Sequence, residues 1–189
     1  KTKRELAPAL KKLSKYKNIR YVLGKHDLRD FEKCDMIVKA AGVPQDSAYI
    51  QHAKKHGIEI AMDASLFAKI AQDVRIVGVT GTRGKSMTTS ATFHILKQNE
   101  KKLGVKVYAG GNLRGMATLP LLKKVQAGDV VVLELDSWQC QGFGDEKLSP
   151  EIAIFTSFMP DHMNYYKDSM KEYFADKANI YRYQKKGDT

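Results

Sequence analysis

One stretch decides the fold of this chain: Val74-Arg75-Ile76-Val77-Gly78-Val79, followed directly by Thr80-Gly81-Thr82-Arg83-Gly84-Lys85-Ser86. Its first six residues are typical of a buried strand, and the glycines that follow predict a tight turn. The turn leads into a helix that we expect from Ser86 to about Asn99. This geometry directs backbone N–H groups and the positive end of a helix dipole at one point, so the stretch predicts an anion-binding site.

The last residues of this stretch carry the chemistry of a phosphate-binding loop. Glycines let the backbone close around an anion, Lys85 supplies a point charge, and the Ser86 hydroxyl on the first helical turn can hold Mg²⁺. The general phosphate-loop pattern has a glycine where this sequence has Val79, four residues away from Gly84-Lys85. The stretch therefore predicts a phosphate loop of a particular subtype.

The composition is that of a globular chain with an excess of positive charge. The chain has 189 residues, a formal net charge of +11 and two cysteines, Cys34 and Cys140, that show no metal-ligand spacing. The lysines are spread along the chain and no aromatic-basic stacking pattern accompanies them, so we interpret the charge as an aid to solubility with a bias toward anionic small substrates. We expect no nucleic-acid partner, no membrane segment, no signal peptide, and a reduced, cytoplasmic protein.

Strand-like and helix-like segments alternate along the chain, which predicts an α/β fold with a mainly parallel sheet. A fresh strand–helix–strand unit begins at Asp73, so we place a domain boundary near Gln72. A final helix is expected from Asp168 or Ser169 to about Tyr183. Strands are expected at residues 19–23, 36–39, 58–61, 74–79, 105–108, 129–135 and 152–155.

Three of these strands end in residues that carry chemistry, and ligands of open parallel sheets bind beyond such ends. The first end is the phosphate loop, the second carries Glu134 and Asp136, and the third leads to Asp161-His162. If the second strand persists, Glu134 and Asp136 project from one face, where their oxygens suit Mg²⁺. The alternative for each acid is a solvated residue at a strand exit.

His162 and Lys177 are weak signals when they are taken alone. A single loop histidine is more often a surface or hydrogen-bonded residue than a metal ligand, and His162 differs from the other histidines only by its place at a strand end. Lys177 lies inside the last expected helix, where a lysine is typically solvated.

Five motifs, however, occur in the same order as in the Mur ligases. They are Thr-Gly-Thr-Arg-Gly-Lys-Ser at 80–86, Gly-Gly-Asn at 110–112, Glu-Leu-Asp-Ser-Trp-Gln at 134–139, Pro-Asp-His-Met-Asn-Tyr-Tyr at 160–166, and Asp-Lys-Ala-Asn-Ile-Tyr at 176–181. A turn at 38–44 and a segment at 62–67 extend the similarity to nearly the whole chain. The chain therefore resembles the Mur ligase family, and most of all its D-glutamate-adding members.

The resemblance implies an ATP-dependent amide ligase of peptidoglycan precursor synthesis. Such an enzyme adds D-glutamate to UDP-N-acetylmuramoyl-L-alanine through an acyl phosphate, and it uses ATP and two Mg²⁺ ions. The resemblance further implies a catalytic role for Lys85, His162 and Lys177, and we expect a monomer. The implied ATP-binding residues are Gly81, Thr82, Arg83, Gly84, Lys85, Ser86 and Met87; the implied metal ligands are Ser86, Glu134, His162 and a carbamylated Lys177; the implied substrate contacts are Gly42, Asn112, Ser137 and Gln139.

The implied architecture is a partial, Rossmann-like UDP-binding domain over residues 1–72 and an incomplete phosphate-loop-type ATP-binding central domain over residues 73–189. The first strand of the UDP-binding domain and the carboxy-terminal amino-acid-binding domain have no counterpart in this sequence. We therefore expect a fragment that is inactive by itself.

Departures from the family pattern leave other functions open. Arg83 replaces the usual asparagine, Met87 a threonine, and Asp136 a common serine. Within the superfamily, the alternatives are a ligase for another amino acid and a folylpolyglutamate-type synthetase. The alternative of another class is a nucleotide-binding module associated with nucleic acid, which a steep salt dependence of DNA binding would support.

Overall fold

The computed structural model describes residues 3–189, which form two compact units. Unit 1 contains the residues up to Ile37 together with 45–59, and unit 2 contains 38–44 and 60–189. This division places helix α3 (Asp63–Ile70), which the expected boundary near Gln72 assigns to the first domain, in unit 2. The physical reason is burial, because Phe67 of this helix is fully buried in a hydrophobic core that also contains Ile76.

Unit 1 contains three helical segments, α1 (Lys3–Leu13), the short 3₁₀ helix η1 (Leu28–Phe31) and α2 (Ala48–Lys55). Two short strands, β1 (Met36–Val38) and β2 (Glu59–Ala61), form a separate two-stranded sheet, and the residues of each strand are divided between unit 1 and unit 2. The strand expected at 19–23 was wrong, because these residues adopt no regular structure. Most of them are exposed, and no neighbouring strand in the described part of the chain pairs with them. The backbone therefore forms no strand-to-strand hydrogen bonds there.

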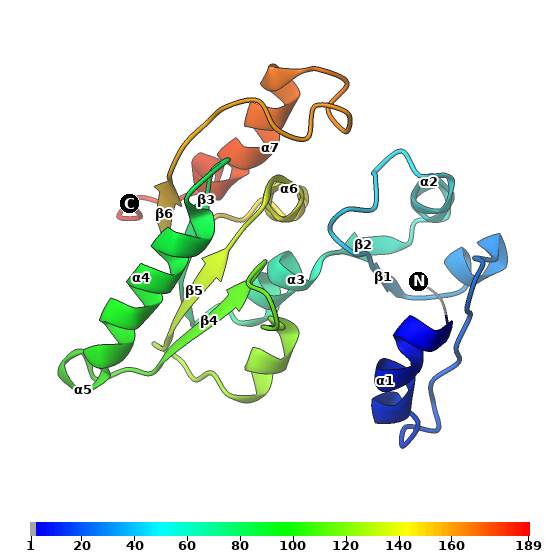
Figure 1. The fold of residues 1–189 in the computed structure, drawn as a ribbon, viewed down its shortest axis with the longest axis horizontal. Coiled ribbons are helices and arrows are strands. Elements are labelled where there is room, and N and C mark those ends of the chain that lie inside the picture. Colours follow the sequence, from blue (N-terminus) through cyan, green and yellow to red (C-terminus); the bar gives the residue numbers. More distant parts are fainter. Residues whose placement is uncertain (1–2) are drawn as a thin grey trace. The chain divides into compact units, whose positions relative to one another are not determined.

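Unit 2 is built on a four-stranded sheet (Figure 1). Its strands are β3 (Arg75–Thr80), β4 (Val107–Gly111), β5 (Val130–Glu134) and β6 (Ile152–Phe155), in the order β4-β5-β3-β6. All three pairings are parallel, which confirms the expected α/β fold with a parallel sheet. Glu134 stands opposite both Val79 and Gly111 in the register, so three strand ends meet at one edge.

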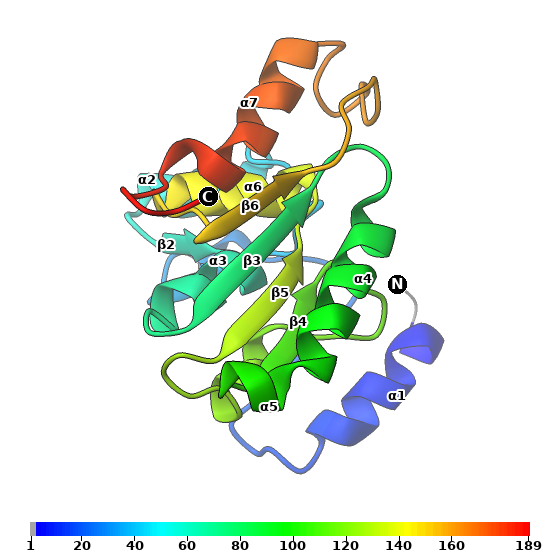
Figure 2. The same ribbon diagram turned by 90° about the vertical axis from the view of Figure 1, so that its left-hand side faces the viewer.

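Helices cover both faces of this sheet (Figure 2). On one face, Phe93 and Leu96 of α4 (Lys85–Gln98) pack against a core of valines that includes Val79 and Val132. On the other face, α3, α6 (Ser137–Asp145) and α7 (Met170–Arg182) pack against Val131, Leu133 and Leu135. Helix α5 (Glu100–Leu103) and the 3₁₀ helix η2 (Leu119–Lys123) complete the connections.

The strands are apolar because both faces of a parallel sheet are buried in such a layered fold. Val131, Val132 and Leu133 are all fully buried, and burial of one such side chain contributes about 1.5–3 kcal/mol. This rigid centre fixes the carboxyl edge of the sheet, where the candidate site lies. Within residues 3–189, no helix combines the length and apolar character that crossing a membrane would need.

Candidate functional site

The phosphate loop connects β3, which ends at Thr80, to α4, which begins at Lys85. Gly81 and Gly84 have φ angles of +141° and +84°, a conformation that favours glycine. A Cβ atom on Gly81 would also lie 2.1 Å from Thr156 Oγ1, so the loop has no room for a side chain there. The glycines thus set a tight turn that directs the first backbone N–H groups of α4 outward.

The segment after β6 holds the loop in place. Ser157 O accepts a hydrogen bond from Thr82 N at 2.8 Å, and Ser157 Oγ accepts one from Arg83 N at 2.9 Å. Thr156 Oγ1 donates to Arg83 O at 2.6 Å, and the buried Thr82 hydroxyl lies 3.1 Å from Met159 O. Two strand ends are therefore joined into one rigid rim.

Two lysines converge on the carbonyl of Gly81. Lys85 Nζ donates to Gly81 O at 3.0 Å and to Thr82 O at 3.1 Å, while Lys177 Nζ donates to Gly81 O at 2.8 Å. Lys177 is buried, with its ammonium group 4.9 Å from the ring centroid of Tyr173. Burial, and to a smaller extent the nearby charge of Lys85, lower the pKa of Lys177 to about 8. A sizeable fraction of this amine is consequently neutral near physiological pH.

At the second strand end, Glu134 is buried beside Asn112. Glu134 Oε1 accepts from Asn112 Nδ2 at 3.4 Å, and Asn112 N donates to Glu134 O at 2.8 Å. Glu134 Oε2 is buried and has no hydrogen-bond partner among the described residues. Gly111 allows this close approach, since a Cβ there would lie 2.0 Å from Glu134 O. A buried carboxylate oxygen without a partner is what a hard cation such as Mg²⁺ can satisfy.

Glu134 and Asp136 would project from one face only if the strand persisted to Asp136, and this condition is not met. Strand β5 ends at Glu134, and Asp136 is the N-cap of α6. Asp136 Oδ1 accepts from Gln139 N at 2.7 Å, and Gln139 Oε1 accepts from Asp136 N at 3.2 Å, which forms a capping box. A helix forms here in place of a longer strand because Asp136 supplies an acceptor for the free N–H groups of the first helical turn.

At the third strand end, His162 is exposed and has a φ angle of +55°. Its ring packs 4.8 Å from that of Trp138, and its Nε2 lies 4.0 Å from Asp161 Oδ2. In the part of the chain that the structure describes, these are its side-chain partners, and neither Glu134 nor Lys177 is among them.

The electrostatics of Asp136 nevertheless connect the three strand ends. Burial raises the pKa of Asp136, while the positive charges of Lys177, Lys85 and His162 each act to lower it. Asp136 therefore experiences groups from α7, from the phosphate loop and from the segment after β6. Hydrogen bonds to Gly81 O join Lys85 and Lys177 at this edge, whereas the side chain of His162 contacts Trp138 and Asp161.

A cavity of about 370 Å³ adjoins this edge within unit 2. Its wall contains Asn112 and Gln139, two of the expected substrate contacts, together with Asp63 and the buried Lys39. Lys39 Nζ donates to Val43 O at 3.0 Å and so steadies the turn that contains the exposed Gly42. Gly42 and the buried Ser137 are outside the wall of this cavity.

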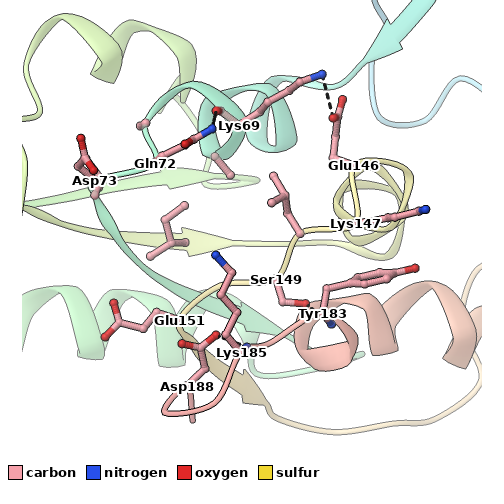
Figure 3. Close-up of a pocket in the computed structure, with 15 residues that line it drawn as sticks. Lys69, Gln72, Asp73, Glu146, Lys147, Ser149, Glu151, Tyr183, Lys185 and Asp188 are labelled. Carbon is pink, nitrogen blue, oxygen red and sulfur yellow. Dashed lines mark hydrogen bonds and ion pairs between the residues drawn. The ribbon is translucent and has the colours of Figure 1, made fainter.

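A second cavity, of about 610 Å³, lies where β3 and β6 begin rather than where they end (Figure 3). Lys69 and Glu146 form an ion pair of 3.0 Å above it, and Tyr183 and Lys185 approach it from the last residues of the chain. None of the sequence-predicted site residues lines this cavity.

Sequence reasoning missed several residues that shape the site. Tyr173 lies under Lys177 and its hydroxyl is 3.3 Å from that of Thr82, while Thr156 and Ser157 hold the phosphate loop. The position of Thr156 and Ser157 directly after a strand could have indicated their role from the sequence. The position of Tyr173 could not, because it depends on how α7 returns to the sheet.

Comparison with known proteins decides the family. The family described as "Mur ligase middle domain" matches residues 79–189. The chain belongs to the Mur ligase family. Its curated relatives include UDP-N-acetylmuramoylalanine–D-glutamate ligases of Borreliella burgdorferi, 39% identical over 99% of this chain, and of Roseiflexus sp., 36% identical over 90%.

This Mur ligase chain spans 39% and 35% of the length of those two relatives. Among solved structures, the chain is similar to a UDP-N-acetylmuramate:L-alanyl-gamma-D-glutamyl-meso-diaminopimelate ligase from Neisseria meningitides, with a TM-score of 0.58. The match covers 98% of this chain and 59% of that one at 14% identity, so it shows the Mur ligase fold alone.

Proposed function

We propose that this chain is the nucleotide-binding part of a ligase that adds D-glutamate to UDP-N-acetylmuramoyl-L-alanine. The observation that carries the proposal is the convergence of Lys85 and Lys177 on the Gly81 carbonyl, beside a buried acid at the same sheet edge. The names of relatives that are 34–39% identical over most of the chain support the choice of D-glutamate. Residues 1–72 and 73–189 are proposed as parts of a UDP-binding and an ATP-binding domain.

In this proposal the phosphate loop binds ATP. Gly81, Thr82 and Gly84 shape the backbone, the first-turn N–H groups of Lys85, Ser86 and Met87 point at the phosphates, and Lys85 and Arg83 add positive charge. When bound, ATP supplies the phosphoryl group that activates the substrate carboxylate. The Lys85 ammonium group donates to two loop carbonyls, which hold it at the loop, and it has no acidic partner among residues 3–189.

The proposed metal ligands are Ser86 and Glu134 for one Mg²⁺ and His162 with Lys177 for a second. Glu134 fits this role because its buried Oε2 lacks a partner among the described residues. Lys177 fits it because only a neutral amine adds CO₂ to become an anionic carbamate ligand, and burial lowers its pKa to about 8. The exposed His162 can turn toward the edge without disturbing the core.

The proposed substrate contacts are Gly42, Asn112, Ser137 and Gln139. Asn112 and Gln139 face one cavity, which Lys39 and Asp63 also line, so this cavity is a suitable place for part of the UDP-muramoyl-alanine substrate. Asn112 additionally bonds to Glu134, and this contact couples the substrate side of the edge to the metal side.

Nucleotide binding by this chain provides the first test. Titration with Mg²⁺·ATP, followed by calorimetry, should show binding that Lys85→Ala abolishes or weakens at least about tenfold, because a charge-assisted contact to phosphate contributes about 1.5–3 kcal/mol. Lys102→Ala, at an exposed position of α5, is the matched control and should bind as the unchanged chain does. Equal binding by all three proteins would refute the loop assignment.

The second test concerns the amino acid. The longest natural chain that carries this sequence should incorporate labelled D-glutamate into UDP-N-acetylmuramoyl-L-alanine when ATP is present. L-Lysine, L-alanine and meso-diaminopimelate are the comparison substrates. Preference for one of these amino acids would leave the assignment to the Mur ligase family intact and would overturn the proposal of D-glutamate as the substrate.

A further inference from the structure

Two histidines and a glutamate gather in unit 1, which contains none of the site residues described above. Glu32 follows η1, His52 lies in the last turn of α2, and His56 is the first residue after that helix. One ligand atom from each residue lies within 4.8 Å of the other two. His52 Nε2 is 2.8 Å from Glu32 Oε1, and the two imidazole ring centroids are 4.4 Å apart.

The local structure sets the orientation of both rings. A spacing of four residues places His52 and His56 on the same face at the C-terminal end of α2, where the helix dipole favours a cation. His56 Nδ1 lies 2.9 Å from His52 O, and it must donate because a carbonyl can only accept. The lone pair of His56 is therefore on Nε2. A ring N–H donated to a backbone carbonyl is the usual support of a metal-binding histidine.

Aromatic packing positions Glu32, the third residue of the cluster. Phe31 of η1 and Tyr49 of α2 have ring centroids 5.2 Å apart, and His26 packs edge-on against Tyr49 at 5.0 Å. Glu32 follows Phe31 directly, so this packing holds its carboxylate against α2. The side chains of His52 and Glu32 are 24% and 31% exposed and His56 is exposed, so a dissolved ion can reach all three.

An ion pair between His52 and Glu32 would account for two of the three residues but not for the approach of His56. In a tetrahedral zinc site with bonds of about 2.0–2.1 Å, neighbouring ligand atoms lie about 3.3 Å apart. The separations here run from 2.8 Å to at most 4.8 Å, so small side-chain rotations suffice. Two imidazoles and one carboxylate favour zinc-like ions over Mg²⁺ or Ca²⁺, which prefer oxygen ligands.

We propose that Glu32, His52 and His56 bind a divalent transition-metal ion of the zinc type, with water completing its coordination. The ion joins η1 to the end of α2, and thereby stabilises this part of unit 1. The site is separate from the proposed ATP and Mg²⁺ site in both residues and metal preference.

Zinc titration of the chelator-treated chain tests this proposal. Calorimetry with Zn²⁺, and visible absorption with Co²⁺ as a spectroscopic substitute, should show one site that His56→Ala and Glu32→Gln each weaken at least about tenfold. Excess Mg²⁺ should not compete. His94→Ala is the matched control, because His94 is an exposed helical histidine outside this cluster, and it should bind Zn²⁺ as the unchanged chain does.

Thermal unfolding gives a second readout. Zn²⁺ should raise the midpoint of the unchanged chain and of His94→Ala but not that of His56→Ala, since an ion that binds only the folded state stabilises it. Glu32→Gln keeps a hydrogen bond to His52 and preserves the test if a histidine variant fails to fold. Zinc affinity within twofold of the unchanged chain in both ligand variants would overturn the proposal.

Discussion

Replacing Gly81 with alanine should destabilise the chain because the phosphate loop has no space for a Cβ atom. At φ +141° the backbone is in a region that L side chains rarely adopt, and the added atom would lie 2.1 Å from Thr156 Oγ1 and 2.9 Å from Ser157 N. Backbone strain of this kind costs about 1–3 kcal/mol, and overpacking costs about 1–3 kcal/mol more. Together they predict a loss of about 2–6 kcal/mol in the free energy of unfolding.

Two glycines of the same chain serve as graded controls. Gly84 also has a positive φ, +84°, but the nearest atom to an added Cβ is 3.7 Å away, so Gly84→Ala should lose only about 1–2 kcal/mol. Gly42 has no positive φ and open space around it, so Gly42→Ala should change stability by less than about 0.5 kcal/mol.

Urea denaturation followed by far-ultraviolet circular dichroism measures all three variants. The expected order of loss is Gly81→Ala, then Gly84→Ala, then Gly42→Ala. Binding of Mg²⁺·ATP should fail in Gly81→Ala even where the protein remains folded, because the displaced rim of Thr156 and Ser157 no longer holds the loop. A Gly81→Ala protein within about 0.5 kcal/mol of the unchanged chain would refute the reasoning.

Three further predictions concern buried groups. Lys177→Met should raise the free energy of unfolding at pH 7 by about 1–3 kcal/mol, because it removes a lysine whose charging opposes folding: its folded pKa of about 8 lies below the usual 10.5. Urea titrations at several pH values should show this gain vanish between pH 8 and 10.5. Burial raises the pKa of Asp176 to about 6, so its ionisation opposes folding, and the cost is complete above that pH. Asp176→Asn should therefore be more stable by about 2 kcal/mol at pH 8, with an advantage that fades as the pH falls from 6 to 4. Gly78→Ala would place a Cβ 2.4 Å from the ring of Pro150 and should lose about 1–3 kcal/mol; the double variant with Pro150→Ala should recover part of this loss in a mutant cycle.

The central sheet could be predicted because its signals are local. The valine run before Gly81 and the run that ends at Glu134 are buried on both faces, and such runs look alike in any layered α/β fold. The loop glycines were equally clear, since their positive φ angles leave few other residues possible.

The failures follow from long-range or competing effects. The segment at 19–23 has strand-like residues, but it has no partner strand among the described residues. The helix that begins at Ser137 was missed although Asp136 and Gln139 have capping-box spacing, because the apolar run before them suggested a longer strand. The burial of Lys177 depends on the return of α7 to the phosphate loop, which no local pattern encodes.

The shared acceptor at Gly81 places the ammonium group of Lys177 beside that of Lys85. The charge of Lys85 is one of the causes that lower the pKa of Lys177, after burial. An anion that neutralises Lys85 would remove part of the repulsion between the two ammonium groups and make Lys177 a stronger base. If Lys177 instead lost its proton, its bond to Gly81 O would weaken and Lys85 would be the main donor to that carbonyl. The protonation of a residue deep in the last helix thus responds to whatever occupies the mouth of the loop.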